Sequence, residues 1–171
     1  MRVWQPAYIG IGSNLADPRA QVTRAAHRIA ALAEVSLARL SPLYGSRPLG
    51  PADQPDFVNA VAGVLTRLEP EALLAALEAV EGDFGRPRVH ERWGPRVIDL
   101  DLLVHGAVRR DGPSLTLPHP GIAERNFVLY PLADVAPDLE VPGLGRAADL
   151  KQRLSSEGLW RLDAASGAPA R

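Results

Sequence analysis

Two aspartates, Asp99 and Asp101, stand inside an apolar run and have the types and spacing that metal chemistry requires. Residues i and i+2 of a β-strand share a face and lie about 6.5–7 Å apart, so both carboxylates would point one way while Leu100 points into the core. Neighbouring carboxylates repel unless a cation compensates them. Hard oxygen ligands at this spacing suit Mg²⁺, which bridges carboxylates to phosphates. A solvated face of an edge strand is the structural alternative.

A run of arginines comes immediately before these aspartates. Four of them fall within eleven residues: Arg86, Arg88, Arg92 and Arg96. Guanidinium groups grip phosphate through paired hydrogen bonds, so arginines next to metal-binding carboxylates indicate a nucleoside triphosphate as ligand. A basic loop that only pairs with surface acids is the alternative.

Two further groups of residues predict a heterocycle site and a phosphate contact. Phe57 and Asn59 share one face of a predicted strand and combine an aromatic surface with a carboxamide. Trp93 in the basic segment would add a second aromatic surface. His119, between two prolines and near Arg125, would contact phosphate as a cation or as a hydrogen-bond donor. Core packing and helix capping explain the same residues without a ligand.

The elements that must position these residues alternate between strands and helices. Turn residues and apolar periodicity predict strands at 3–11, 35–44, 57–65 and 96–105, and helices at 18–34 and 70–82. Two segments rich in proline and glycine, 45–55 and 83–95, are predicted to be long functional loops. The order βαββαβ is that of a ferredoxin-like α+β fold, with both helices on one face of a mainly antiparallel sheet.

The remaining chain must cover the other face of that sheet. Helical stretches are predicted at 121–135 and 146–156, followed by a short strand at 159–162. We therefore expect residues 1–163 to form a single domain and residues 164–171 to form a disordered tail.

The composition excludes several classes of protein. The 171 residues include 19 basic and 20 acidic ones, a formal net charge of -1, so no global positive field attracts nucleic acid or a membrane surface. Only Lys151 is a lysine, so nearly all basic residues are arginines. Without cysteine there is no disulfide and no thiolate metal site, and no apolar run approaches the roughly 18 residues of a membrane span. We expect a cytoplasmic monomer that binds small molecules.

Five short blocks follow one another along residues 7–138. They are residues 7–14, 48–59, 85–88 and 91–101, and lastly 118–120 with Arg125 and 127–129; the fourth contains Arg-Trp-Gly-Pro-Arg-x-x-Asp-x-Asp. Taken together, these blocks resemble the 6-hydroxymethyl-7,8-dihydropterin pyrophosphokinase family. The resemblance implies a ferredoxin-like core with C-terminal additions in a three-layer α/β/α sandwich. It also implies transfer of pyrophosphate from ATP to the pterin hydroxymethyl group, with release of AMP, in folate biosynthesis.

The resemblance further implies roles at the phosphate end of the site. Asp99 and Asp101 would bind two Mg²⁺ ions between ATP and the attacking hydroxyl. Arg86 and Arg96 would stabilise the transferred group. The residues on ATP would be Arg88, His119 and Arg125. As acceptor of the hydroxyl proton, Asp99 is our hypothesis.

At the pterin end, the resemblance implies a pocket with the ring stacked between two phenylalanines. Its residues would be Ser46, Leu49, Phe57, Asn59, Trp93 and Phe127. The predicted loops 45–55 and 83–95 would be lids that close and exclude water.

Four positions depart from the family pattern. Ser46 and Val97 stand where threonine is common, Gly121 where many members have arginine, and Arg47 where proline or an acidic residue is frequent. None of the four is a metal ligand or a central arginine, so we expect activity to be retained. We expect the contacts of the first lid and the grip on phosphate near Gly121 to differ.

Two other functions are compatible with parts of the pattern. A metal-dependent nucleotidyltransferase would use the same aspartates but attack the α-phosphorus and release pyrophosphate. An RNA-binding ferredoxin-like domain would share the topology, but it needs exposed aromatic residues and a basic sheet.

Overall fold

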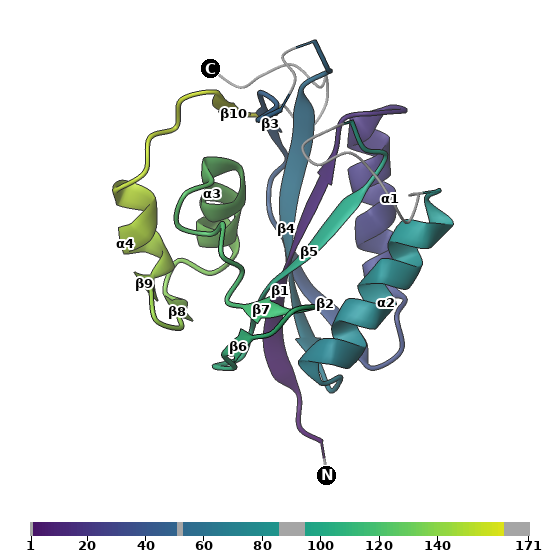
Figure 1. Cartoon of the computed structure of the whole chain (residues 1–171), viewed down its shortest axis with the longest axis vertical. Helices are drawn as coiled ribbons and strands as arrows, with labels where there is room; N and C mark the ends of the chain where they lie inside the picture. The colour runs from purple at the N-terminus through teal and green to yellow at the C-terminus, as the bar shows by residue number, and fades with distance from the viewer. Residues whose placement is uncertain (1, 51–52, 86–94, 163–171) are drawn as a thin grey trace.

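A six-stranded antiparallel sheet forms the centre of the computed structural model, which describes residues 2–50, 53–85 and 95–162 (Figure 1). The strand order is β10–β3–β4–β1–β5, and β2 pairs with β4 on the same side as β3. The strands are β1 (Gln5–Ser13), β2 (Val35–Leu40), β3 (Tyr44–Ser46), β4 (Phe57–Thr66), β5 (Asp99–His105) and β10 (Leu159–Arg161). The central strands β1 and β4 alternate small and branched apolar residues, which suits strands buried on both faces.

Helices α1 (Pro18–Ala30) and α2 (Pro70–Asp83) cover one face of the sheet. Each begins with a proline in its first turn, where a missing N–H is tolerated, and Asp17 caps α1 by accepting a bond from the amide of Ala20. The apolar residues of α1 recur every three or four positions and are buried against the sheet: Val22, Ala25, Ala26 and Ile29. The predicted placement of both helices on one face is confirmed.

The opposite face is covered by α3 (Asn126–Val135) and α4 (Ala147–Gln152), with two small hairpins beside them. The hairpins are β6 (Arg110–Asp111) with β7 (Thr116–Leu117), and β8 (Glu140–Val141) with β9 (Gly145–Arg146). A second core of buried residues, including Val61, Leu103, Leu129 and Leu132, joins α3 to the sheet. The three-layer α/β/α arrangement is therefore confirmed.

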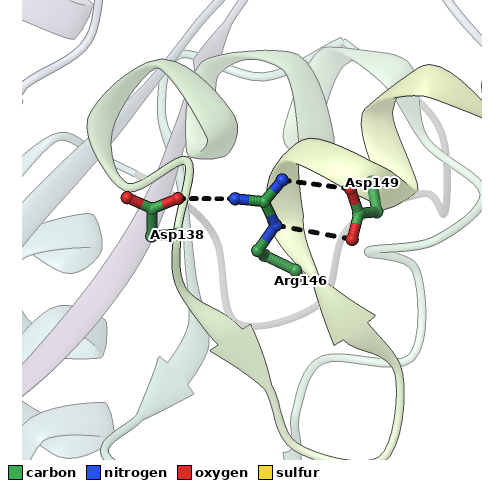
Figure 2. Close-up of polar contacts among 3 residues, drawn as sticks. All are labelled: Asp138, Arg146 and Asp149. Carbon is green, nitrogen blue, oxygen red and sulfur yellow. Dashed lines mark hydrogen bonds and ion pairs between the residues drawn. The ribbon is translucent and has the colours of Figure 1, made fainter.

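Arg146 ties the C-terminal elements together at the surface, as Figure 2 shows. Its Nη1 lies 2.7 Å from Oδ1 of Asp138, and its Nη2 lies 3.2 Å from Oδ1 of Asp149. All three side chains are exposed, so these ion pairs orient the connection between α3 and α4 more than they stabilise it.

Several predicted boundaries were wrong. The strand expected at 35–44 is broken into β2 and β3, because Pro42 has no N–H to donate and Ser41 takes over the pairing with Val61. Its amide donates to Val61 O at 2.9 Å, and its Oγ accepts from the Val61 amide at 2.9 Å. The loop expected at 45–55 therefore starts only after Ser46.

The C-terminal helices are shorter than predicted. Residues 121–125 form a turn and the helix begins at Asn126, whereas the helix expected at 146–156 ends at Gln152. The strand predicted at 159–162 exists and extends the sheet beyond β3. The tail expected at 164–171 lies outside the described residues. Within the described ranges, no helix combines the length and the apolar character that a membrane span requires.

Candidate active site

A cleft of about 370 Å³ opens on the sheet face that α3 covers, beside the first turn of that helix. It brings together ten of the residues predicted for the site: Ser46, Leu49, Phe57, Asn59, Arg96, Asp99, Asp101, His119, Arg125 and Phe127. The other three predicted residues, Arg86, Arg88 and Trp93, lie outside the described residues. Residues from Gly10 to Val128 thus line one cavity, although they are up to 118 positions apart in the sequence.

The sheet register places the two ends of the cleft at a fixed separation. Gly12 of β1 pairs with Asn59 on one side and with Asp99 on the other. Residues that pair directly across antiparallel strands share a face, and neighbouring strands lie about 4.8 Å apart. The backbones of Asn59 and Asp99 are therefore about 10 Å apart on one face, since two strand spacings separate them.

Glycines form the floor between these two ends. A Cβ atom at Gly12 would lie 3.2 Å from Oδ1 of Asn59 and 3.9 Å from Cδ1 of Phe57. Gly10 pairs with Asp101, and a Cβ there would contact Leu103 at 3.5 Å. The absence of side chains at Gly10 and Gly12 leaves the space over β1 open to a ligand.

A buried polar pair lies at the end of the cleft that Phe57 lines. The Nδ2 of Asn59 donates a 2.7 Å hydrogen bond to Oγ of Ser46, and the two residues are only 6% and 3% exposed. This bond orients the carboxamide, whose second N–H and Oδ1 have no partner among the described residues. Phe57 and Phe127 line the same cavity, so an oriented amide stands beside two aromatic rings.

The aspartates have the alternation that the sequence predicted. Leu100 and Leu102 are buried at 4% and 3% exposure in the core under α1 and α2, while Asp99 and Asp101 line the cleft on the other face. Nη1 of Arg96 lies 3.5 Å from Oδ1 of Asp99. Among the described residues, no cluster of three or more acidic, histidine or cysteine side chains is arranged to hold a metal.

Glu81 of α2 supports the strand that carries the aspartates. Its Oε2 accepts a 2.9 Å hydrogen bond from the amide of Leu100, between Asp99 and Asp101, and Glu81 is only 9% exposed. Since β5 is the last strand of the sheet, this amide points away from β1, and the carboxylate satisfies it. Sequence reasoning missed Glu81 because it is one of several acidic residues in a helix.

His119 is fixed as a neutral hydrogen-bond donor. Its backbone amide donates to Leu103 O at 2.8 Å, and its Nδ1 accepts the amide of Gly121 at 3.1 Å, which leaves the proton on Nε2. Burial, followed by the nearby charge of Arg125, lowers the pKa of His119, and Asp99 partly offsets this. Of the two roles predicted for His119, the structure favours the neutral donor over the cation.

Asn14 links the end of β1 to residues 54–55 and to Arg96, and it was missed as a functional residue. It is 1% exposed. Its amide donates to Arg96 O at 3.0 Å, and its Oδ1 accepts the Arg96 amide at 2.8 Å. Its Nδ2 donates to Oε1 of Gln54 and to the carbonyl of Pro55, both at 2.9 Å. In the sequence Asn14 stands at the end of the block of residues 7–14, and nothing in that block indicates these distant partners.

Arg47 also lines the cleft, although it was predicted only as a departure from the family pattern. Its amide donates to Gly158 O at 3.1 Å, next to β10. The C-terminal strand therefore borders the segment that carries Ser46 and Leu49.

A second cavity of about 280 Å³ adjoins the first. The two share Asp101, His119 and Pro120. The second cavity continues past Leu102 to the segment between β6 and β7, where Ser114 and Thr116 line it. Asp101 and His119 therefore lie where the two cavities meet: the first cavity contains the aromatic residues, and the second lies beside the β6–β7 hairpin.

Comparison with known proteins finds relatives that match most of the chain. Residues 8–137 match the family model described as 7,8-dihydro-6-hydroxymethylpterin-pyrophosphokinase (HPPK). The 2-amino-4-hydroxy-6-hydroxymethyldihydropteridine pyrophosphokinase of Pseudomonas aeruginosa is 49% identical over 161 residues, which cover 94% of this chain and 99% of the relative. The enzyme of the same name from Haemophilus influenzae is 40% identical, over 92% of this chain and 98% of its own.

A solved structure of wild-type Plasmodium falciparum HPPK-DHPS with pterin and p-hydroxybenzoate has the same fold, with a TM-score of 0.75 and 12% identity. The match covers 99% of this chain but only 48% of that longer chain, and at this identity it confirms the α+β fold alone. The family, in contrast, is shown by the sequence matches. The chain belongs to the 7,8-dihydro-6-hydroxymethylpterin-pyrophosphokinase family.

Proposed function

We propose that this cleft performs the family's reaction with the residues described above. The chain is a 2-amino-4-hydroxy-6-hydroxymethyldihydropteridine diphosphokinase of folate biosynthesis, which transfers pyrophosphate from ATP to hydroxymethyldihydropterin. A bond forms between the hydroxymethyl oxygen and the β-phosphorus, and the bond from that phosphorus to the α–β bridging oxygen breaks, so AMP leaves. The observation that carries the residue assignment is the pairing of Gly12 with both Asn59 and Asp99.

Asn59 and the two phenylalanines are proposed to bind the pterin. A flat heterocycle with an amide-like edge needs one donor and one acceptor in a fixed orientation, and the carboxamide held by Ser46 offers both. Phe57 and Phe127 would stack on the ring faces, and Leu49, which is 59% exposed, would cover the ring from the first lid. We propose the same pocket for Trp93, as the family resemblance implies.

Asp99 and Asp101 are proposed to hold Mg²⁺. The fit rests on the donors: two carboxylates on one strand face are hard oxygen ligands, and phosphate oxygens and water would complete the shell, as Mg²⁺ prefers. When bound, Mg²⁺ neutralises phosphate charge and favours departure of the AMP oxygen. Two ions, as the family resemblance implies, remain part of this proposal.

Arg96, His119 and Arg125 are proposed to bind the phosphates. Guanidinium groups aimed at the transferred unit stabilise charge that develops there during transfer. His119 would donate from Nε2, because Nδ1 is occupied by the amide of Gly121. Arg86 and Arg88 keep the roles that the resemblance implies, with Arg86 on the transferred group and Arg88 on ATP.

The second cavity supports a direction for ATP across the site. Asp101 and His119 line both cavities, so a triphosphate bound beside them would place the nucleoside next to the β6–β7 hairpin and the reacting phosphate next to the pterin. Asp99, which pairs with Gly12, lies nearer the pterin end than Asp101, which pairs with Gly10. This placement supports Asp99 as acceptor of the hydroxyl proton.

The RNA-binding alternative is not supported by the arrangement of layers. A ferredoxin-like domain of that kind uses an open sheet face with exposed aromatic residues. Here α3 packs on that face through Leu129 and Leu132, and Phe57 and Phe127 line a cleft beside it.

The products of the reaction distinguish the proposal from a nucleotidyltransferase. We expect the protein, ATP, Mg²⁺ and hydroxymethyldihydropterin to yield AMP and the pterin diphosphate; free pyrophosphate would instead support attack at the α-phosphorus. Asp99→Asn and Asp101→Asn should each lower kcat at least about 100-fold, since each removes a charged ligand from the metal. Glu78→Gln, on the exposed side of α2, is the matched control and should leave kcat unchanged. Nearly full turnover of Asp99→Asn at saturating Mg²⁺ would contradict the assignment.

We further propose that residues 1–163 act as one domain and that the protein works as a monomer. One chain supplies the ten described site residues that line the first cavity, which supports this proposal. Sedimentation at catalytic concentrations should give the mass of one chain, 18.3 kDa.

A further inference from the structure

We infer that Gly121 is a positioning residue, which seats the side chain of Arg125 in the cleft and holds the ring of His119 in the matching orientation. This inference rests on the proposed function, since it concerns how two phosphate-binding groups are held.

The side chain of Arg125 occupies the space in front of Gly121. A Cβ atom at Gly121 would lie 2.7 Å from Cζ, 2.7 Å from Nε and 2.9 Å from Cδ of Arg125. All three distances are below 3.0 Å, which is too short for a non-bonded contact of a Cβ atom. Any side chain at position 121 would therefore displace the guanidinium of Arg125. The backbone of Gly121 has no positive φ, in contrast to Gly85 or Gly106, so its conformation is open to any residue. Space for Arg125 is thus the reason that a glycine fits here.

The backbone of Gly121 holds both neighbours as well. Its amide donates to Nδ1 of His119 at 3.1 Å, and its carbonyl accepts the amide of Arg125 at 3.1 Å. The turn that these bonds close returns Arg125 over Gly121 just before α3 begins at Asn126. One residue therefore sets the tautomer of His119 through its N–H and the place of Arg125 through its missing side chain.

The two groups influence each other electrostatically in this arrangement. The charge of Arg125 helps to keep His119 neutral, so that one cation and one neutral donor line the acidic part of the cleft. A phosphate oxygen next to them would meet the guanidinium and Nε2–H together. Displacing the guanidinium of Arg125 would remove the cation and leave the Nε2–H donor of His119 in place.

A double-mutant cycle on ATP binding tests the inference. The variants are Gly121→Ala, Arg125→Ala and the combination, with the affinity for a non-hydrolysable ATP analogue in Mg²⁺ measured by calorimetry. We expect each single variant to weaken binding about tenfold, and the double variant to bind no more weakly than Arg125→Ala, because Gly121 acts through Arg125. The affinity for hydroxymethyldihydropterin should stay unchanged in all three.

Two controls separate positioning from general damage. Gly82→Ala lies in α2, where a Cβ would meet nothing within 4 Å, and it should bind the analogue as the wild type does. The nitrogen resonances of His119 should still report Nε2–H in Gly121→Ala, since the amide donor remains. The inference would be overturned if Gly121→Ala bound the ATP analogue with wild-type affinity. It would also be overturned if the loss of affinity in the double variant equalled the sum of the losses in the two single variants. Release of AMP by the wild-type protein tests the proposed function separately. A failure of the proposed function can therefore be told apart from a failure of the inference about Gly121.

Discussion

Asn59 and Asp99 face the same cleft from opposite sides of Gly12, which pairs with both of them in the central sheet. This register converts two distant sequence blocks into the two ends of one site, about 10 Å apart because two strand spacings separate them. A hydroxymethyl group on a ring bound at Asn59 would point along this floor towards the carboxylates. Strand pairing therefore sets the distance between the proposed pterin end and the proposed metal end of the site.

Gly12→Ala should damage the pterin end in particular. The new Cβ would stand 3.2 Å from Oδ1 of Asn59, where the carboxamide must turn aside to avoid it. We expect the KM for hydroxymethyldihydropterin to rise about tenfold, equivalent to about 1.4 kcal/mol, with little change in ATP affinity. Gly82→Ala is the control outside the cleft, because a Cβ there would meet nothing within 4 Å. Equal effects of the two variants on pterin binding would contradict the explanation.

Ser46 should matter through its hydroxyl alone. Ser46→Ala would leave a buried N–H of Asn59 without its acceptor, at a cost of about 1–3 kcal/mol, so pterin affinity should fall about tenfold or more. Ser46→Thr keeps the hydroxyl and should bind pterin within about twofold of the wild type. Titration of pterin into each variant checks this. If the threonine variant lost as much affinity as the alanine variant, the hydrogen bond would not be the cause.

Asn14 should hold residues 54–55 and Arg96 against the end of β1. Asn14→Ala removes the side-chain bonds to Arg96, Gln54 and Pro55, and we expect it to lower the free energy of unfolding by about 2 kcal/mol and to lower kcat. Asn14→Asp keeps an acceptor for the Arg96 amide but loses the donors to Gln54 and Pro55. Hydrogen exchange should therefore show the Arg96 amide protected in Asn14→Asp and exposed in Asn14→Ala. The same protection in both variants would contradict this division.

Glu81 should stabilise the strand that carries the aspartates. Glu81→Ala leaves the Leu100 amide without an acceptor, which should cost about 1–3 kcal/mol in the free energy of unfolding and weaken Mg²⁺-dependent ATP binding. Glu81→Gln keeps an oxygen acceptor and should recover most of the stability in urea titrations. A glutamine variant as unstable as the alanine variant would show that the hydrogen bond to Leu100 is not the relevant contact.

The alternation of β5 was predictable because it depends on neighbouring residues only. Leu100 and Leu102 had to point into the core once a strand was assumed, and Asp99 and Asp101 then had to share the other face. The family resemblance supplied others, such as Ser46, Leu49 and Phe127. Local pattern and resemblance together were enough to predict the class of fold and most of the described site.

Long-range pairing was not predictable in the same way. Nothing in the sequence states that Gly12 pairs with both Asn59 and Asp99, because register is set by packing across the whole sheet. The break at Ser41 and Pro42 depends on Val61, twenty positions further on, and the partners of Asn14 lie 40 to 82 positions away. These contacts were missed because each side chain is ordinary until its distant partner is known.

His119 should make the stability of the protein depend on pH. Burial and the charge of Arg125 hold its pKa below the ordinary value of 6.5, so the folded state prefers the neutral ring. Above pH 6.5 the ring is neutral in both states and the full stability is present. As the pH falls below 6.5, the unfolded state takes up the proton first, and stability declines until the pH reaches the lowered pKa of the folded state. His119→Asn keeps an oxygen that can accept the Gly121 amide but cannot take up this proton.

Urea titrations at pH 7.5, 6.5 and 5.5 measure this contribution. The difference in free energy of unfolding between the wild type and His119→Asn should narrow as the pH falls, because only the wild type loses the stability tied to a neutral His119. Each unit by which the folded pKa lies below that of the unfolded state corresponds to about 1.4 kcal/mol at the acid end. A difference that stays constant over the three pH values, or widens at low pH, would show that the folded state does not hold His119 neutral.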